Sequence, residues 1–122
     1  MTKVLLVDDN DSILGLFTMI LTREGYSVAV ASNGVEALSL ARRKKFDVVI
    51  TDIIMPFKDG IETIMELKGL FPAIKIIAIS GGERKGNKDL LRMAEMAGAC
   101  RIVSKPFEPH DLVATLKDCL AT

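Results

Sequence analysis

Short apolar runs alternate along the chain with longer segments in which apolar residues recur at helical spacing. The apolar runs are rich in β-branched residues and short enough for strands, and they cover residues 3–7, 26–31, 46–50, 74–79 and 101–104. Each run precedes a segment with one apolar helical face, and these segments cover residues 11–24, 35–45, 60–70, 88–97 and 108–120. Five strand-then-helix units with short connections predict an α/β domain with a parallel sheet and right-handed crossovers.

The apolar positions also indicate which side of each helix is buried. The helix of residues 11–24 is expected to bury Ile13, Phe17, Ile20 and Leu21. The helix of residues 60–70 is expected to bury Ile61, Ile64, Met65 and Leu67. For the first of these helices, Asp11 or Ser12 is the candidate N-terminal cap and Gly25 the candidate stop.

The run that starts at Phe46 is apolar at nearly every position, which is typical of a central parallel strand covered on both faces. It ends at Thr51 and Asp52, and the Met-Pro and Asp-Gly pairs that follow predict an irregular loop. In open parallel sheets, ligands bind outside the carboxyl ends of the strands. Asp52 is therefore a candidate for chemistry, although an Asp at this position can also merely end a strand or cap a helix.

Other predicted strands also end in polar residues. The first is followed by Asp8 and Asp9, the fourth by Ser80, and the fifth by Lys105. If the first and third strands are neighbours, the three carboxylates converge, and like charges at that range repel by several kcal/mol unless a cation binds or a proton is taken up. A small all-oxygen site that keeps water is typical of Mg²⁺.

The same set of residues fits phosphoryl transfer. Aspartate carboxylates act as nucleophiles in this chemistry, and the hydroxyl of Ser80 and the ammonium of Lys105 suit the oxygens of a phosphoryl group. Each residue has a simpler interpretation on its own: Ser80 as a turn residue, Lys105 as a solvated charge, and Asp8 with Asp9 as a helix-capping pair. Their joint occurrence at four strand ends favours one shared site.

Composition narrows the functional classes further. The 122 residues are 49% hydrophobic and 26% charged, which is typical of one globular domain. Sixteen basic residues balance sixteen acidic ones, so no net field favours nucleic acid or an anionic membrane. No apolar run approaches the roughly 20 residues of a membrane span, and the apolar stretch near the N-terminus is too short for a signal peptide. We therefore expect a cytoplasmic protein without membrane insertion.

Other site signatures do not occur in the sequence. Cys100 and Cys119 lack the spacing of a metal site and are expected to be reduced packing thiols. Neither GxxxxGK[ST] nor GxGxxG is present. His110 has no Cys or His close to it in sequence and is expected to be an exposed residue of the last helix.

With these residues in place, the chain resembles the receiver domain of two-component response regulators along its whole length. The shared motifs are VDD at residues 7–9, DxxMPxxDG at residues 52–60, Ser80, and KPF at residues 105–107. The resemblance implies a single receiver domain over residues 1–122. Its expected fold is flavodoxin-like, a doubly wound five-stranded parallel sheet in the order 2-1-3-4-5 with five helices.

The resemblance also assigns a role to each site residue. Asp52 would be the phosphoacceptor and would take a phosphoryl group from the phosphohistidine of a sensor histidine kinase or a histidine phosphotransfer protein. Asp9, Asp52 and the backbone carbonyl of Ile54 would bind Mg²⁺, and Asp8 would complete the metal site by holding metal-bound water. Ser80 and Lys105 would contact the phosphoryl oxygens.

The chain departs from the family pattern at Ile102, where relatives often carry an aromatic residue. A β-branched side chain is short and stiff, so we expect the glycine-containing loop of residues 80–86 to be the moving part instead. Met96 points away from the apolar face of its helix. It is a candidate contact for a downstream partner on the fourth and fifth helices, or for a second copy in a homodimer.

The leading functional hypothesis is a signalling switch and not a metabolic enzyme. Phosphorylation of Asp52 would shift an equilibrium between two states, and the domain would assist only its own phosphorylation and dephosphorylation. The alternatives are a phosphorylation-independent interaction module and a small phosphohydrolase with an aspartate nucleophile. The sequence contains no DNA-binding motif.

Overall fold

The computed structural model of the chain describes residues 1–53, 59–80, 88–104 and 107–122, with only the backbone at residues 88–91. Within these ranges, the strands are β1 (Lys3–Val7), β2 (Ser27–Ala31), β3 (Val48–Asp52), β4 (Lys75–Ser80) and β5 (Arg101–Ser104). The helices are α1 (Asp11–Arg23), α2 (Gly34–Arg43), α3 (Gly60–Leu70), α4 (Lys88–Ala97) and α5 (Pro109–Ala121). The strands pair in parallel in the order β2-β1-β3-β4-β5, which confirms the predicted topology.

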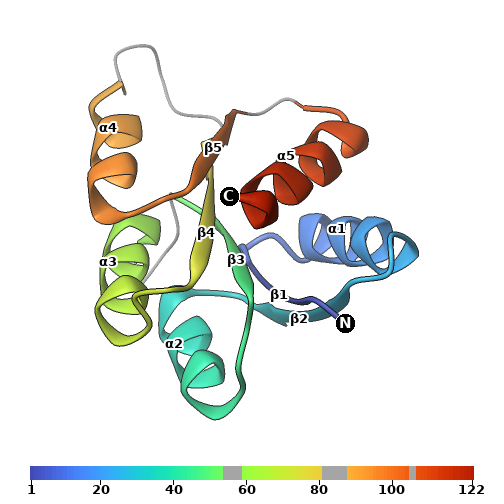
Figure 1. The fold of residues 1–122 in the computed structure, drawn as a ribbon, viewed down its shortest axis with the longest axis horizontal. Coiled ribbons are helices and arrows are strands. Elements are labelled where there is room, and N and C mark those ends of the chain that lie inside the picture. The colour runs from blue at the N-terminus through green and yellow to red at the C-terminus, as the bar shows by residue number, and fades with distance from the viewer. Residues whose placement is uncertain (54–58, 81–87, 105–106) are drawn as a thin grey trace.

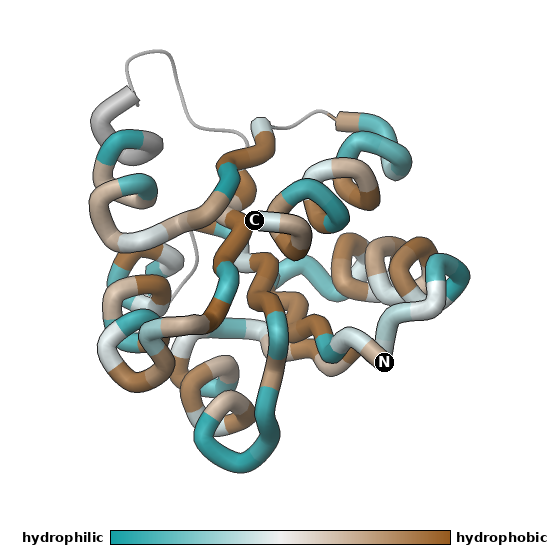
Figure 2. Tube along the Cα trace, in the orientation of Figure 1, coloured by the Kyte–Doolittle hydropathy of each residue, from teal (hydrophilic) through white to brown (hydrophobic). Residues whose placement is uncertain are grey.

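Helices cover both faces of the sheet, with α1 and α5 on one side and α2, α3 and α4 on the other (Figure 1). Alternate residues of each strand point to opposite faces, so Leu5 and Val7 pack with the second group of helices while Val4 and Leu6 pack with the first. In Figure 2 the strands are the most hydrophobic part of the trace, and polar residues follow the outer sides of the helices. The core is therefore two apolar layers separated by the sheet.

Every residue of β3 is buried, as the continuous apolar run predicted for a central strand. The register aligns Val7 with Thr51 and Asp52 with Ile79, so the carboxyl ends of β1, β3 and β4 meet at one edge of the sheet. The predicted site residues that fall in the described part of the chain lie at that edge. None of the helices in the described part of the chain has the length and apolar character needed to cross a membrane.

Two local expectations were wrong. The cap of α1 is Asn10, whose side-chain oxygen accepts hydrogen bonds from the backbone N–H groups of Ser12 (3.0 Å) and Ile13 (3.2 Å), and not Asp11 or Ser12. Met65 is 60% exposed, and Thr63 of the same helix is fully buried instead. The Thr63 hydroxyl donates to the carbonyl of Asp59 at 2.8 Å, which allows a polar residue to occupy the inner face.

Candidate functional site

The carboxyl edge of the sheet brings together three aspartates from two adjacent strand ends. One carboxylate oxygen from each of Asp8, Asp9 and Asp52 lies within 4.8 Å of the other two. Asp8 and Asp52 are only 4% and 7% exposed, whereas Asp9 is exposed. The predicted convergence of these carboxylates is confirmed.

This arrangement concentrates negative charge where water is scarce. At an effective dielectric constant of about 20, two unit charges 4.8 Å apart repel by roughly 3.5 kcal/mol. The donor set consists of carboxylate oxygens, which hard divalent cations prefer, and its partial exposure at Asp9 leaves one side open to solvent. The chemistry and spacing of the three groups therefore fit a divalent cation.

Asp8 is held by the turn that leads into α1. Its backbone N–H donates to the carbonyl of Ala31 at the end of β2 (3.1 Å), and its Oδ1 accepts from the N–H of Asn10 at 2.9 Å. Asn10 in turn caps α1, so one chain of hydrogen bonds fixes the carboxylate and the helix start together. The positive end of the α1 dipole thereby begins next to the acidic cluster and offsets part of its charge.

The backbone at Asp52 is fixed from three sides. The Thr51 hydroxyl donates to the carbonyl of Asp52 (3.0 Å), and the N–H of Ile53 donates to the carbonyl of Ile79 on β4 (3.0 Å). On the third side, the N–H of Gly60 donates to the carbonyl of Ile53 at 2.7 Å. The carboxylate of Asp52 therefore projects from a rigid platform at the end of the central strand.

Gly60 is a structural requirement of the site that the sequence reading did not single out. A Cβ on Gly60 would lie 2.6 Å from the Cα of Ile53 and closer still to the carbonyl oxygen of Asp52, so any side chain would displace this backbone. Asp59 caps α3 by accepting from the N–H of Glu62 (2.8 Å). The Asp-Gly pair was the available signal, but it indicates a turn as readily as a helix start against a strand.

Ser80 is 8% exposed and ends β4, one position beyond the strand partner of Asp52. The structure thus places it at the same edge as the carboxylates, as predicted. Ile54, Lys105 and residues 81–86 lie outside the described residues, so the predicted roles of the Ile54 carbonyl and the Lys105 ammonium remain predictions.

The remaining candidates are separate from this cluster. Cys100 and Cys119 are both free thiols. Burial, together with a hydrogen bond to Cys100, raises the pKa of the Cys119 thiol to about 12, so it is a protonated packing group. The His110 side chain is 81% exposed, as expected, and its Nε2 lies 3.3 Å from a carboxylate oxygen of Asp111.

The half-buried side chain of Ile102 packs against the core layer formed with α2, α3 and α4. Ala94 of α4 is fully buried in the same layer, whereas Met96 is 81% exposed. The exposure of Met96 agrees with its predicted position away from the apolar face of α4.

Comparison with known proteins shows similarity along nearly the whole chain. Residues 4–117 match the family model described as the response regulator receiver domain. The chain is 36% identical over 121 residues to the probable transcriptional regulator ycf29 of Porphyra purpurea, covering 98% of this chain and 57% of that protein. It is 34% identical over 118 residues to the chemotaxis protein CheY of Halobacterium salinarum, covering 97% of this chain and 96% of that protein.

A crystal structure of a CheY-like response regulator receiver domain protein from Methanospirillum hungatei has the same fold. It superposes with a TM-score of 0.93 at 30% sequence identity, covering 99% of this chain and 94% of the other. Several similar proteins are longer: the chain spans 57%, 26% and 48% of the transcriptional regulators from Porphyra purpurea, Klebsiella oxytoca and Bacillus subtilis (its PhoP).

Proposed function

The chain belongs to the response regulator receiver domain family of two-component systems, and we propose that Asp52 is its phosphoacceptor. The supporting observation is the carboxylate cluster, in which Asp52 ends the central strand within 4.8 Å of carboxylate oxygens of Asp8 and Asp9. A fixed backbone below Asp52 and a hydroxyl at the end of the adjacent strand complete the arrangement. Receiver domains act as signalling switches, and this chain would assist only its own phosphorylation and dephosphorylation.

The phosphoryl donor is proposed to be the phosphohistidine of a sensor histidine kinase or a histidine phosphotransfer protein. A carboxylate oxygen of Asp52 attacks the phosphorus while the bond from phosphorus to the donor imidazole nitrogen breaks, and the electron pair stays on that nitrogen. The Ser80 hydroxyl donates to a phosphoryl oxygen, and the Lys105 ammonium neutralises another. The product is an acyl phosphate on the protein.

The acidic cluster could hold a metal, and we propose Mg²⁺ with ligands from Asp9, Asp52 and the carbonyl of Ile54. When bound, Mg²⁺ supplies positive charge that neutralises the carboxylates and the incoming phosphoryl oxygens. The carboxylate of Asp8 is anchored by the N–H of Asn10, and it would complete the metal site by holding metal-bound water. Hydrogen bonds fix the carboxylate of Asp8 and the backbone at Asp52, so these two groups would need little rearrangement to accommodate the cation.

Receiver domains interact with downstream effectors, and we propose that this one does so through α4 and α5. We also propose that residues 1–122 form a single receiver domain and that the protein is cytoplasmic. The exposed Met96 offers a flexible contact for a partner or a second copy. Ile102 is half-buried against the layer that contains Ala94 and lacks an aromatic ring that could turn. The loop of residues 80–86 is therefore the proposed moving part.

A mass measurement tests the central proposal. Incubation with a small acyl phosphate and Mg²⁺ should add about 80 Da, one phosphoryl group replacing a proton, and peptide mapping should place it on Asp52. Asp52→Asn should lose the adduct, and EDTA should suppress it in the wild type. An adduct retained in Asp52→Asn contradicts the assignment. No adduct in the wild type favours the interaction module, and repeated turnover of a free phosphoester favours the phosphohydrolase.

A further inference from the structure

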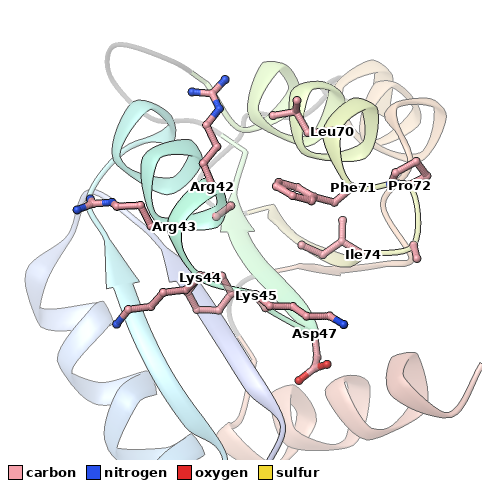
Figure 3. A pocket seen from close by; sticks show the side chains of 12 residues that line it. Arg42, Arg43, Lys44, Lys45, Asp47, Leu70, Phe71, Pro72 and Ile74 are labelled. Carbon is pink, nitrogen blue, oxygen red and sulfur yellow. The ribbon is translucent and has the colours of Figure 1, made fainter.

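A hollow of about 680 Å³ lies at the edge of the sheet opposite the acidic cluster (Figure 3). It is formed where α2 and α3 end and where the chain enters β3 and β4, and its lining covers residues 41–47 and 70–74. Asp47, at the end of the first part of the lining, lies five positions before Asp52 along the chain, a length of about 17 Å at strand spacing. The hollow is thus distinct from the phosphoacceptor site, and its volume falls within the roughly 300–1,000 Å³ of ligand pockets.

The floor of the hollow is apolar. Phe46 and Ile74 are nearly buried, Phe71 is half-buried, and Leu70 is 48% exposed at the rim. Figure 3 shows Phe71 and Ile74 facing the space between the two helix ends. An exposed leucine beside a half-buried aromatic ring provides apolar contact area that the domain itself does not cover.

The rim is basic. Arg42, Arg43, Lys44 and Lys45 are consecutive and exposed, and within the described ranges none of them forms an ion pair with an acidic side chain. The acidic residue of the lining, Asp47, accepts from the backbone N–H of Lys3 at 2.8 Å. In a chain with no net charge, this run is a local concentration of positive charge.

The helix dipole explains only half of this run. Arg42 and Arg43 lie in the last turn of α2, where cations are stabilised by the negative end of the helix. Lys44 and Lys45 follow the helix, and Lys45 extends along the mouth of the hollow towards Asp47 (Figure 3). Lys44 points away from the apolar side chains labelled in Figure 3, so Lys45 is the cation whose position beside the uncovered apolar surface the helix dipole does not explain.

The position of the helix ends restricts where a ligand of the hollow can carry negative charge. Because α2 and α3 both direct their carboxyl ends at the hollow, a small anion would meet negative dipole ends if it entered deeply. Apolar atoms fit the floor, whereas negative charge is favoured only at the rim. The matching ligand has an apolar centre and acidic flanks.

From this charge and polarity pattern we infer that the hollow binds an acidic segment of a partner protein through one aromatic or aliphatic side chain flanked by carboxylates. The apolar side chain occupies the floor beside Leu70 and Phe71, and the carboxylates contact Arg42 and Lys45. The site goes beyond the phosphoacceptor function and leaves the carboxyl edge of the sheet uncovered. A partner can therefore be held there whether or not Asp52 carries a phosphoryl group.

The test uses a fluorescein-labelled peptide with a central Phe, two acidic residues on each side and Gly-Ser ends, measured by fluorescence anisotropy. We expect saturable binding to the full chain. Arg42→Glu/Lys45→Glu should weaken it at least tenfold, because each reversal removes an attraction and adds a repulsion. Leu70→Ser should weaken it by about threefold through lost apolar contact. Replacing the peptide's Phe by Ala should have a comparable effect.

A matched control is Arg23→Glu, which reverses an exposed cation in the last turn of α1, away from the hollow. It should leave peptide affinity within twofold of the wild type. All variants should still take a phosphoryl group from the acyl phosphate, so failure of the docking site is separable from failure of the phosphoacceptor assignment. The inference is overturned by no binding up to about 1 mM peptide, by equal loss in Arg23→Glu, or by equal affinity for the Ala peptide or for single-stranded RNA.

Discussion

Asp52→Asn is expected to stabilise the domain in the absence of Mg²⁺, although it removes the proposed reactive residue. Asp8 and Asp52 are nearly buried and have carboxylate oxygens within 4.8 Å, where repulsion is roughly 3.5 kcal/mol at a dielectric constant of about 20. Relaxation of the side chains and counterions reduces this value. We therefore expect a gain of about 1–3 kcal/mol in the free energy of unfolding, or roughly 4–12 °C in Tm for a domain of this size.

Mg²⁺ should stabilise the wild type more than the Asp52→Asn variant. A ligand that binds only the native state stabilises it by about 2.7 kcal/mol at one hundred times its dissociation constant. The wild type should gain close to this amount at such a concentration. The variant, which has one carboxylate fewer for the cation, should gain clearly less at the same concentration.

Urea unfolding followed by circular dichroism, in EDTA and in Mg²⁺, measures both effects. Asp9→Asn should give a smaller gain in EDTA because Asp9 is exposed and better screened. Glu95→Gln, an exposed change on α4, is the control for net charge. A less stable Asp52→Asn in EDTA, or equal Mg²⁺ shifts in wild type and variant, would refute the electrostatic reasoning.

The remaining predictions concern packing, protonation and output. Gly60→Ala should cost about 2–4 kcal/mol in urea unfolding because its Cβ meets backbone, whereas Gly69→Ala, with open space in the same helix, should stabilise by about 0.5–1 kcal/mol. The pKa of Cys119 is raised from 9.0 to about 12, so between these pH values the native state keeps a proton that the unfolded chain loses, and stability should fall as the pH rises from 9.0 towards 12. In native protein at pH 8, iodoacetamide should label Cys100 and spare Cys119. Equal labelling of the two thiols would contradict this. Beryllofluoride should shift amide resonances of residues 81–91, and Ser80→Ala should reduce these shifts; changes confined to the phosphoacceptor and its neighbours would exclude the proposed loop mechanism.

The strands and the site edge were predictable because they depend on local sequence and on one topological rule. A β-branched run such as Val48–Ile50 forms a strand, and β3 continues it through Thr51 and Asp52. A parallel sheet places all carboxyl ends at one edge. The meeting of Asp8, Asp9 and Asp52 then follows once β1 and β3 are neighbours.

The two wrong predictions, the cap of α1 and the burial of Met65, concern positions where more than one residue type can make the required contact. Asp11, Ser12 and Asn10 can all cap α1, and the choice falls on Asn10 because the carboxylate of Asp8 accepts from its N–H and fixes the turn. Met65 is more apolar than Thr63, but the Thr63 hydroxyl bonds to a carbonyl one turn back and needs no water. Contacts of this kind depend on the neighbouring elements, and periodicity does not encode them.

The two proposed sites lie at opposite edges of the sheet, so any energetic coupling between them must pass through the elements that connect these edges. Energetic coupling between distant sites requires an element with two arrangements that both ligands bias. Two elements join Asp52 to the basic hollow, the helix α3 and the strand β3. The helix begins at Gly60 against the backbone of Asp52 and ends at the hollow, and the strand is buried at every residue and paired on both sides. Such a strand has no second low-energy packing, so phosphorylation should leave peptide affinity at the hollow within twofold. A larger change would mean that α2 or α3 shifts against the sheet during signalling, and would place the switch in the helices that form the hollow.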